Sequence, residues 1–423
     1  MLAGCASSQT SRKMSVFCQN DYLLAFDGGG ILRGDNRPQA KTSQNSFHSH
    51  LKSRLDRKFI PKTPRGEETS FLHPAVEEDQ IYRVLVMSGG GQNGAFGAGI
   101  LNGWNKRATG VRRQDIDMIT SISTGAMALT YTLVGNYGAV DQRKRADEAL
   151  KVIFTESDES DLLERKGLFS ILSTNSLVNT KGLNKALAEA AREFLPMIAA
   201  WPDKELVSGK MAFAGMVNLD DSKFYVANLL DVARNTKIDP SAQDCYQEII
   251  QASSAEPVNF PPRFITTDRG DPMKGNMYVD GGLRYGVFWS ESLRQLKERG
   301  AHLEVYVIIN GDLAADSYVC DGQGNCSREK KVTKNKLLNI AKRTQTIATD
   351  QLYKDSLDRI YWTLVREIGK DNFTLKFSYI RPKYIKSQNC QASQSAFDRA
   401  YMSCLYKIGE QMAADWDWLI FKR

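Results

Sequence analysis

Histidine is scarce in this chain. Only four of its 423 residues are histidine, and three of them, His48, His50 and His73, lie within the first 80 residues. The fourth, His302, directly precedes the apolar run Val305–Ile309 and therefore stands at the start of a predicted strand. Sites in parallel α/β sheets lie at the opposite, carboxyl ends of the strands. We therefore expect a structural role for His302 and no catalytic arrangement that depends on a histidine base.

Several other signatures are missing as well. No stretch of 18 apolar residues occurs, so the sequence predicts no transmembrane helix. No cysteine pair has the C-x-x-C spacing of a metal site, and the Gly-Lys-Ser/Thr end of a Walker phosphate loop is absent. We therefore expect neither a metal nor a cofactor. With 42% apolar and 25% charged residues, the composition is that of an ordinary globular protein.

The excess of positive charge is confined to the beginning of the chain. Residues 1–65 hold 11 Lys and Arg against four acids, which accounts for the whole net charge of +7. The remaining residues carry 45 charges of each sign. A basic leader on a neutral body suits an anionic membrane surface, and a solvated linker is the alternative reading. We expect no nucleic-acid partner.

Residues 2–5 (Leu-Ala-Gly-Cys) resemble a bacterial lipobox, in which Cys5 becomes lipidated. The charged and apolar signal segment that should precede a lipobox is not in this sequence, so either the sequence starts late or the match is accidental. The lipobox predicts a lipid anchor in the bacterial cell envelope, at the outer membrane or its periplasmic side. A soluble cytoplasmic or secreted protein is the alternative. The rest of the leader, to residue 80, is polar and predicts a tether with few packed elements.

Six further cysteines follow Cys5 in the chain. Two of them, Cys320 and Cys326, flank a short polar loop that a disulfide would close into a small ring. Such a ring suits an oxidising compartment. Free thiols fit the sequence equally well.

A serine follows a buried strand in the segment Ile116–Gly125. The apolar run to Ile122 predicts the strand, and Ser123-Thr124-Gly125 begins a predicted helix. A serine at such a tight turn is a nucleophile elbow, because the helix N-terminus points its amides at the hydroxyl. The usual elbow is G-x-S-x-G, and Ser121 stands in place of its first glycine. On its own this match is weak.

A glycine-rich loop follows an earlier predicted strand, residues 82–87. Its glycines are Gly89, Gly90, Gly91 and Gly94. A loop of this kind can turn backbone N–H groups inward around an anion. A dinucleotide site would require an acid at the end of the next strand, but the nearby acids Asp115 and Asp117 precede that strand. An oxyanion hole ahead of the serine elbow fits better.

A third motif supplies a carboxylate. The short apolar run Met277–Val279 predicts a strand that delivers Asp280 onto the turn Gly281-Gly282. The glycines allow this turn to press against another loop. Asp280 is therefore the candidate general base for Ser123.

These motifs, in this order, resemble the patatin-like phospholipase family. The segment 252–257 (Ala-Ser-Ser-Ala-Glu-Pro) is also similar to the one that precedes the family's Asp-Gly-Gly. The resemblance implies a three-layer α/β/α fold with a mainly parallel central sheet. It also implies hydrolysis of acyl esters of membrane lipids or lysolipids, of the phospholipase A or lysophospholipase type. Ser123 and Asp280 would form the dyad and the four glycines the oxyanion hole.

The resemblance suggests three parts: the leader 1–80, a catalytic domain 81–312 and an extension 313–423 packed on that domain. The extension predicts two helices, 335–364 and 397–419, around a strand at 373–380. Core packing is favoured over a membrane-facing patch for its aromatic residues Trp416 and Trp418. Two other functions stay open. Ser121 favours an inactive lipid-binding protein, and an acyltransferase would use the same dyad.

Overall fold

A computed structural model of the chain describes most of the residues after position 80 and a short segment before it. The described residues are 14–26, 81–107, 109–165, 176–201, 209–289, 296–297, 300–313, 317–320, 326–329, 333, 335–390 and 397–421. Cys5, the three leader histidines and the glycine-rich segment 28–30 lie outside them.

A mixed sheet of 11 strands forms the centre of the described residues, in the order β1-β9-β10-β7-β4-β3-β11-β14-β15. In addition, β8 pairs with β7, and β2 pairs with β8. The consecutive strands β7, β4, β3, β11 and β14 run parallel to one another. The strands are β1 (Val16–Phe17), β2 (Leu23–Ala25), β3 (Ile81–Met87), β4 (Met118–Ile122), β7 (Met211–Asn218), β8 (Phe224–Asn228), β9 (Arg263–Thr266), β10 (Asn276–Asp280), β11 (His302–Ile309), β14 (Phe373–Tyr379) and β15 (Leu419–Ile420).

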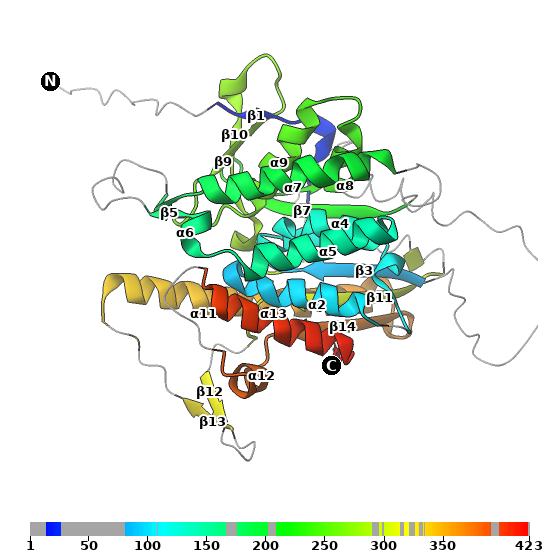
Figure 1. Ribbon diagram of the computed structural model, residues 1–423, viewed down its shortest axis with the longest axis vertical. Coiled ribbons are helices and arrows are strands. Elements are labelled where there is room, and N and C mark those ends of the chain that lie inside the picture. The colour runs from blue at the N-terminus through cyan, green and yellow to red at the C-terminus, as the bar shows by residue number, and fades with distance from the viewer. Residues whose placement is uncertain are drawn as a thin grey trace, which may run out of the picture.

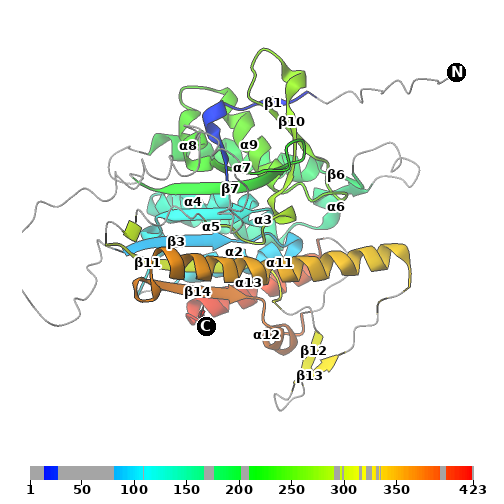
Figure 2. The same cartoon turned by 180° about the vertical axis from the view of Figure 1, so that it is seen from behind.

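Helices cover both faces of this sheet, which gives the three layers expected from the sequence. Figure 1 shows α2, α5, α7 and α13 over one face, and Figure 2 shows α11 across the other. The helices are α2 (Gly94–Asn105), α3 (Thr124–Met127), α4 (Leu129–Tyr137), α5 (Val140–Thr155), α6 (Glu159–Leu162), α7 (Lys181–Ala200), α8 (Leu229–Asn235), α9 (Ser241–Ser253), α11 (Leu337–Glu367), α12 (Pro382–Ser387) and α13 (Arg399–Ala414).

The alternation of side chains along β3 shows why two helical layers are needed. Leu85 and Met87 belong to the core shared with α2, whereas Val84 and Val86 belong to the core shared with α11. Successive side chains of a strand point to opposite faces, and all four are apolar. A strand of this kind is stable only when both faces are covered.

Residues 14–26 of the leader are packed, within the part for which the sequence predicted a tether with few packed elements. β1 pairs with β9 and β2 pairs with β8, and a disulfide joins Cys18 to Cys245 of α9. The side chains of Cys18 and Leu24 are buried. Strands of two or three residues are too short to show the alternating pattern by which a strand is recognised in sequence.

The C-terminal part completes the same sheet and both helical layers. β14 pairs in parallel with β11, α11 covers one face, and α13 packs on α2 over the other. The predicted helix 397–419 is shorter than expected: α13 ends at Ala414, and Trp416 has a φ of +57° that a helix does not allow. Trp416 and Trp418 pack edge-on against Trp104, with ring centroids 5.5 and 5.4 Å apart. Core packing of both tryptophans is confirmed.

A small hairpin projects from the region before α11. It consists of β12 (Ser317–Cys320) and β13 (Cys326–Glu329), and its register places Cys320 opposite Cys326. Another two-stranded sheet joins β5 (Glu164–Arg165) to β6 (Val178–Asn179). A disulfide links Cys390 to Cys404 of α13.

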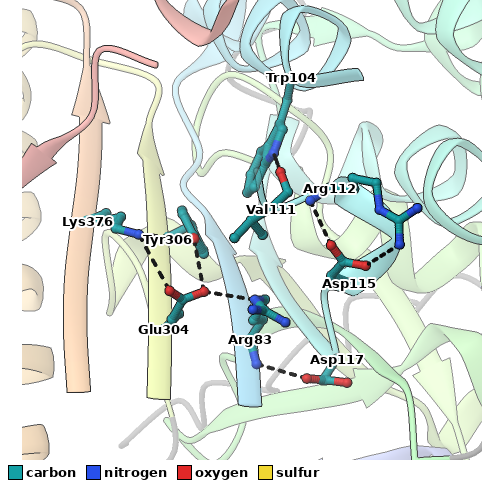
Figure 3. A network of polar contacts seen from close by, with 9 residues as sticks. All are labelled: Arg83, Trp104, Val111, Arg112, Asp115, Asp117, Glu304, Tyr306 and Lys376. Carbon is teal, nitrogen blue, oxygen red and sulfur yellow. Dashed lines mark hydrogen bonds and ion pairs between the residues drawn. The ribbon is translucent and has the colours of Figure 1, made fainter. Parts of the chain in front are cut away.

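The amino ends of the parallel strands are held by charged side chains, as Figure 3 shows. Glu304 of β11 accepts from Arg83 of β3 at 2.8 Å and lies 3.7 Å from the ammonium of Lys376 on β14. Tyr306 also donates to Glu304, at 3.1 Å. The backbone N–H of Arg83 donates to Asp117, just before β4, at 2.9 Å. These contacts fix neighbouring strands relative to one another at their amino ends, whereas the serine elbow lies at the carboxyl end of β4.

Among the described helices, none combines the length and the apolar character that crossing a bilayer requires.

Candidate active site

Strand register brings the predicted nucleophile and base together. β4 and β10 lie on the same edge of β7, since β8 occupies its other edge. β4 runs parallel to β7 and ends with Ile122 beside Gly215, whereas β10 runs antiparallel and ends with Asp280 beside Met216. The two strands therefore meet head to head. Ser123, the residue after β4, faces the carboxyl end of β10.

Ser123 occupies the strained position of a nucleophile elbow. Its φ is +56°, which non-glycine residues rarely adopt, and it directly precedes α3. Its N–H donates to both the carbonyl and the hydroxyl oxygen of Ser253, each at 3.1 Å. The hydroxyl of Ser254 donates to the Ser123 carbonyl at 3.1 Å. These bonds from the end of α9 hold the elbow in its conformation and leave the Ser123 hydroxyl half-buried.

Asp280 is a buried carboxylate beside the serine. Its side chain is 5% exposed, it accepts a hydrogen bond from the N–H of Gly282 at 2.7 Å, and the Ser123 hydroxyl is near enough to favour its ionised form. Its own N–H donates to the carbonyl of Ala255 at 2.9 Å. Burial raises the pKa of Asp280 from 3.8 to about 7, with Glu256 adding to the rise and the Ser123 hydroxyl and the Gly282 N–H opposing it. A base with this pKa is suited to accept a proton near neutral pH.

The glycine-rich loop lies against the elbow. A Cβ atom added at Gly89 would come within 2.8 Å of the Ser123 Cβ. At Gly90, where φ is +152°, an added Cβ would come within 2.1 Å of the Asn310 carbonyl oxygen. The N–H groups of Gly90 and Gly91 donate to no other described residue. Two unused donors in a loop beside the serine can bind an oxyanion.

Gly94 lies farther along, at the start of α2. A Cβ there would come within 2.8 Å of the side chains of Thr124 and Phe154. This close packing of α2 on α3 and α5 is sufficient reason for a glycine at this position. Its predicted part in the oxyanion hole stays a prediction.

Ser121, the departure from the elbow pattern, does not fill the turn. Its side chain is fully buried, and its hydroxyl donates to the carbonyl of Phe213 on β7 at 2.8 Å. The other glycine position is different, because a Cβ at Gly125 would come within 2.8 Å of the Ser88 carbonyl oxygen and 2.9 Å of that of Met87. The structure therefore requires a glycine two residues after Ser123 and accommodates a serine two residues before it.

The sequence did not assign a role to several residues that shape this site. Ser253 and Ser254 lie in the segment that resembles the family, and their part in bracing the elbow follows only from the fold. Asn310 and Tyr353 contact the glycine-rich loop from residues far along the chain. No local pattern marks such residues, because only the packing of β11 and α11 brings them close.

His302 stands apart from this site. It pairs with Ile81 at the amino end of the parallel strands, and burial lowers the pKa of its imidazole. This placement agrees with the structural role predicted for it. In the described part of the chain, no group of three or more His, Cys, Asp or Glu side chains is arranged to hold a metal ion.

Comparison with known proteins agrees with this geometry. Residues 85–291 match the sequence model of the family described as patatin-like phospholipase. No curated protein matches the chain. Among solved structures, the crystal structure of VipD from Legionella pneumophila is similar with a TM-score of 0.37 and 13% identity, covering 86% of this chain and 74% of that one. On the family match, residues 85–291 form a patatin-like phospholipase domain with the patatin fold.

Proposed function

We propose that this protein is a serine acyl hydrolase that cleaves acyl esters of lipids, of the phospholipase A or lysophospholipase type. The family supports lipid acyl hydrolysis in general. The Ser/Asp dyad is supported by the register of β4 and β10, which places Ser123 beside the buried Asp280, whose pKa is raised to about 7. A dyad of this kind requires no histidine.

In the first half of the reaction, the Ser123 oxygen attacks the ester carbonyl carbon while Asp280 takes the serine proton. The tetrahedral intermediate then collapses, and Asp280 returns the proton to the departing alcohol. In the second half, Asp280 takes a proton from water, which attacks the acyl-serine. Collapse releases the fatty acid, and the proton on Asp280 returns to Ser123.

The N–H groups of Gly90 and Gly91 support the negatively charged intermediate. Both lie in the loop next to Ser123 and have no acceptor among the described residues. One donor in a preorganised oxyanion hole typically contributes about 3 kcal/mol to the transition state. Because a carboxylate is a weak base for a hydroxyl, this contribution matters more here than in a site with a histidine.

Apolar side chains on the segments next to the dyad support a lipid substrate. Leu283 follows the Asp-Gly-Gly turn and is 55% exposed, and Val258 follows the segment that braces the elbow and is 68% exposed. Single exposed apolar residues are common on protein surfaces. Two of them on segments that directly follow site residues are suited to contact acyl chains or a bilayer. The basic leader would add attraction to anionic lipids.

For the location we propose a lipid anchor through Cys5 in the bacterial cell envelope. The disulfides Cys18–Cys245 and Cys390–Cys404 support an oxidising compartment. Membrane partitioning of the full-length protein tests the anchor. Loss of partitioning in Cys5→Ser is expected, and unchanged partitioning would exclude it.

A fluorophosphonate probe tests the nucleophile. The wild-type protein should be labelled and should release fatty acid from phospholipid vesicles, and Ser123→Ala should lose both properties. Ser121→Ala is the matched control, because it removes a neighbouring buried hydroxyl that faces away from the turn. Labelling that survives in Ser123→Ala excludes this serine. Acylated alcohols in place of free fatty acid would identify an acyltransferase.

A further inference from the structure

Helix α11 lies outside the residues that match the family, yet it contacts both loops of the site. We propose that Tyr353 and Ser356 of α11 are positioning residues for the reaction. Tyr353 orients the peptide that supplies the oxyanion-hole N–H of Gly90, and Ser356 holds the loop after Asp280. This inference rests on the proposed acyl hydrolase function.

The Tyr353 hydroxyl makes a direct bond to the glycine-rich loop. It donates to the carbonyl oxygen of Gly89 at 2.9 Å, and its side chain is 5% exposed. The Ser88 hydroxyl donates to the same oxygen at 2.7 Å. Burial raises the pKa of the Tyr353 phenol, so it stays a donor across the working pH range. Two donors thus hold the Gly89 carbonyl, and Tyr353 ties it to α11.

The direction of this carbonyl sets the direction of the next N–H. No peptide bond in the described residues is cis, and in a trans peptide the C=O and the following N–H point in opposite directions. The Gly90 N–H is therefore turned away from α11. It has no acceptor among the described residues, so a substrate oxygen can take it. Gly90 itself is flanked by Asn310, which leaves the loop little room to turn.

The same helix face also holds the loop after Asp280. The N–H of Gly286 donates to the Ser356 hydroxyl at 3.1 Å, and the Ser356 side chain is 2% exposed. A Cβ added at Gly286 would come within 2.4 Å of the Tyr353 ring. Tyr353 and Ser356 are neighbours on one face of the helix because they are three residues apart. One turn of α11 therefore fixes the oxyanion loop relative to the loop of the base.

Tyr353→Phe tests the role of the hydroxyl independently of the packing of the ring. The phenylalanine keeps the contact with Gly286 and removes only the bond to Gly89. Tyr361→Phe is the matched control, because this tyrosine is equally buried on the same helix about two turns away. Ser356→Ala tests the second contact.

We expect Tyr353→Phe to lower kcat about tenfold and to leave KM for a soluble ester within about twofold. The reason is that an oxyanion hole stabilises the transition state more than it stabilises the bound substrate. The affinity for a trifluoromethyl ketone, which forms an oxyanion on Ser123, should fall by the same factor. Ser356→Ala should lower kcat less, and Tyr361→Phe should match the wild type. Thermal unfolding of each variant reports whether the fold is kept.

Two results would overturn the inference. One is a wild-type kcat in Tyr353→Phe while Ser123→Ala is inactive, which leaves the proposed function standing. The other is a fall in kcat with unchanged affinity for the ketone, because the oxyanion hole would then be intact and the fall would have another cause. A wild-type protein that neither turns over an ester nor reacts with a fluorophosphonate contradicts the proposed function itself.

Discussion

Ser123 lies beside the carboxylate of Asp280, although the strands that lead to the two residues run in opposite directions. This arrangement exists because β4 and β10 meet head to head along the same edge of β7. It leaves the serine half-buried and the acid almost fully buried. The acid therefore bears a desolvation cost, which one hydrogen bond from the Gly282 N–H offsets only in part.

Asp280→Asn should stabilise the protein at alkaline pH. The pKa of Asp280 is about 7 in the folded chain against 3.8 without burial, so the unfolded chain loses this proton first as pH rises. The free energy of unfolding of the wild type therefore falls between about pH 4 and pH 7. The shift of roughly three units corresponds to at most about 4 kcal/mol, because one unit is about 1.4 kcal/mol.

Urea unfolding at pH 4 and pH 8 measures this effect. The stability advantage of Asp280→Asn over the wild type should be small at pH 4 and large at pH 8. The exposed Asp244→Asn is the control and should show no such difference. An advantage that is the same at both pH values would contradict a raised pKa.

The two glycine positions of the elbow should respond differently to substitution. Gly125→Ala places a Cβ within 2.8 Å of the Ser88 carbonyl oxygen, so we expect a loss of about 1–3 kcal/mol in stability and of most activity. Ser121→Gly removes one buried hydrogen bond, so stability should fall by about 1 kcal/mol and turnover should stay within about threefold. A large gain of activity in Ser121→Gly would show instead that this serine obstructs the elbow.

Leu283→Asn should weaken action on vesicles more than action on a soluble ester. An exposed leucine that enters a bilayer contributes about 1–3 kcal/mol, so KM for vesicles should rise about tenfold while kcat/KM for a short-chain p-nitrophenyl ester stays nearly constant. Ile238→Asn is the control: Ile238 is 83% exposed in the turn before α9, at the end of that helix away from Ser253. Equal effects of the two substitutions on vesicles would remove Leu283 from the lipid-contacting surface.

Loss of the Cys18–Cys245 disulfide should destabilise the protein. It joins residues 227 apart in sequence and ties β1 to α9, so Cys18→Ala should cost about 2–5 kcal/mol in the free energy of unfolding. Denaturant unfolding with and without a thiol reductant measures it. The reductant should have a smaller effect on the variant than on the wild type. Equal stability of variant and wild type without reductant would show that the cross-link contributes nothing.

The strands that carry the site could be predicted from the sequence because each is a short apolar run that ends at a site residue. β3, β4 and β10 are such runs, and the glycines, Ser123 and Asp280 follow directly after them. Their order along the chain gave the family resemblance. The head-to-head meeting of β4 and β10 could not be predicted, since it depends on the antiparallel pairing of β10 with β7.

What the sequence could not show depends on contacts between distant segments. Residues 14–26 join the sheet through strands too short for a pattern to appear. Tyr353 reaches Gly89 from a helix 264 residues farther along the chain, and the helical pattern of α11 marks only its apolar side. The sequence could not show whether the Ser121 side chain fits, because its hydroxyl bonds to the Phe213 carbonyl on the neighbouring strand β7. That bond is a property of the sheet and not of the elbow motif.

The pH dependence of fluorophosphonate labelling tests the central claim most directly. Labelling requires Ser123 as nucleophile and Asp280 in its deprotonated form, whose pKa is about 7. We expect a second-order rate constant that rises between pH 5 and pH 9 with one apparent pKa near 7, and no labelling of Ser123→Ala. A rate constant that does not change across this range would contradict the claim that a buried Asp280 activates Ser123.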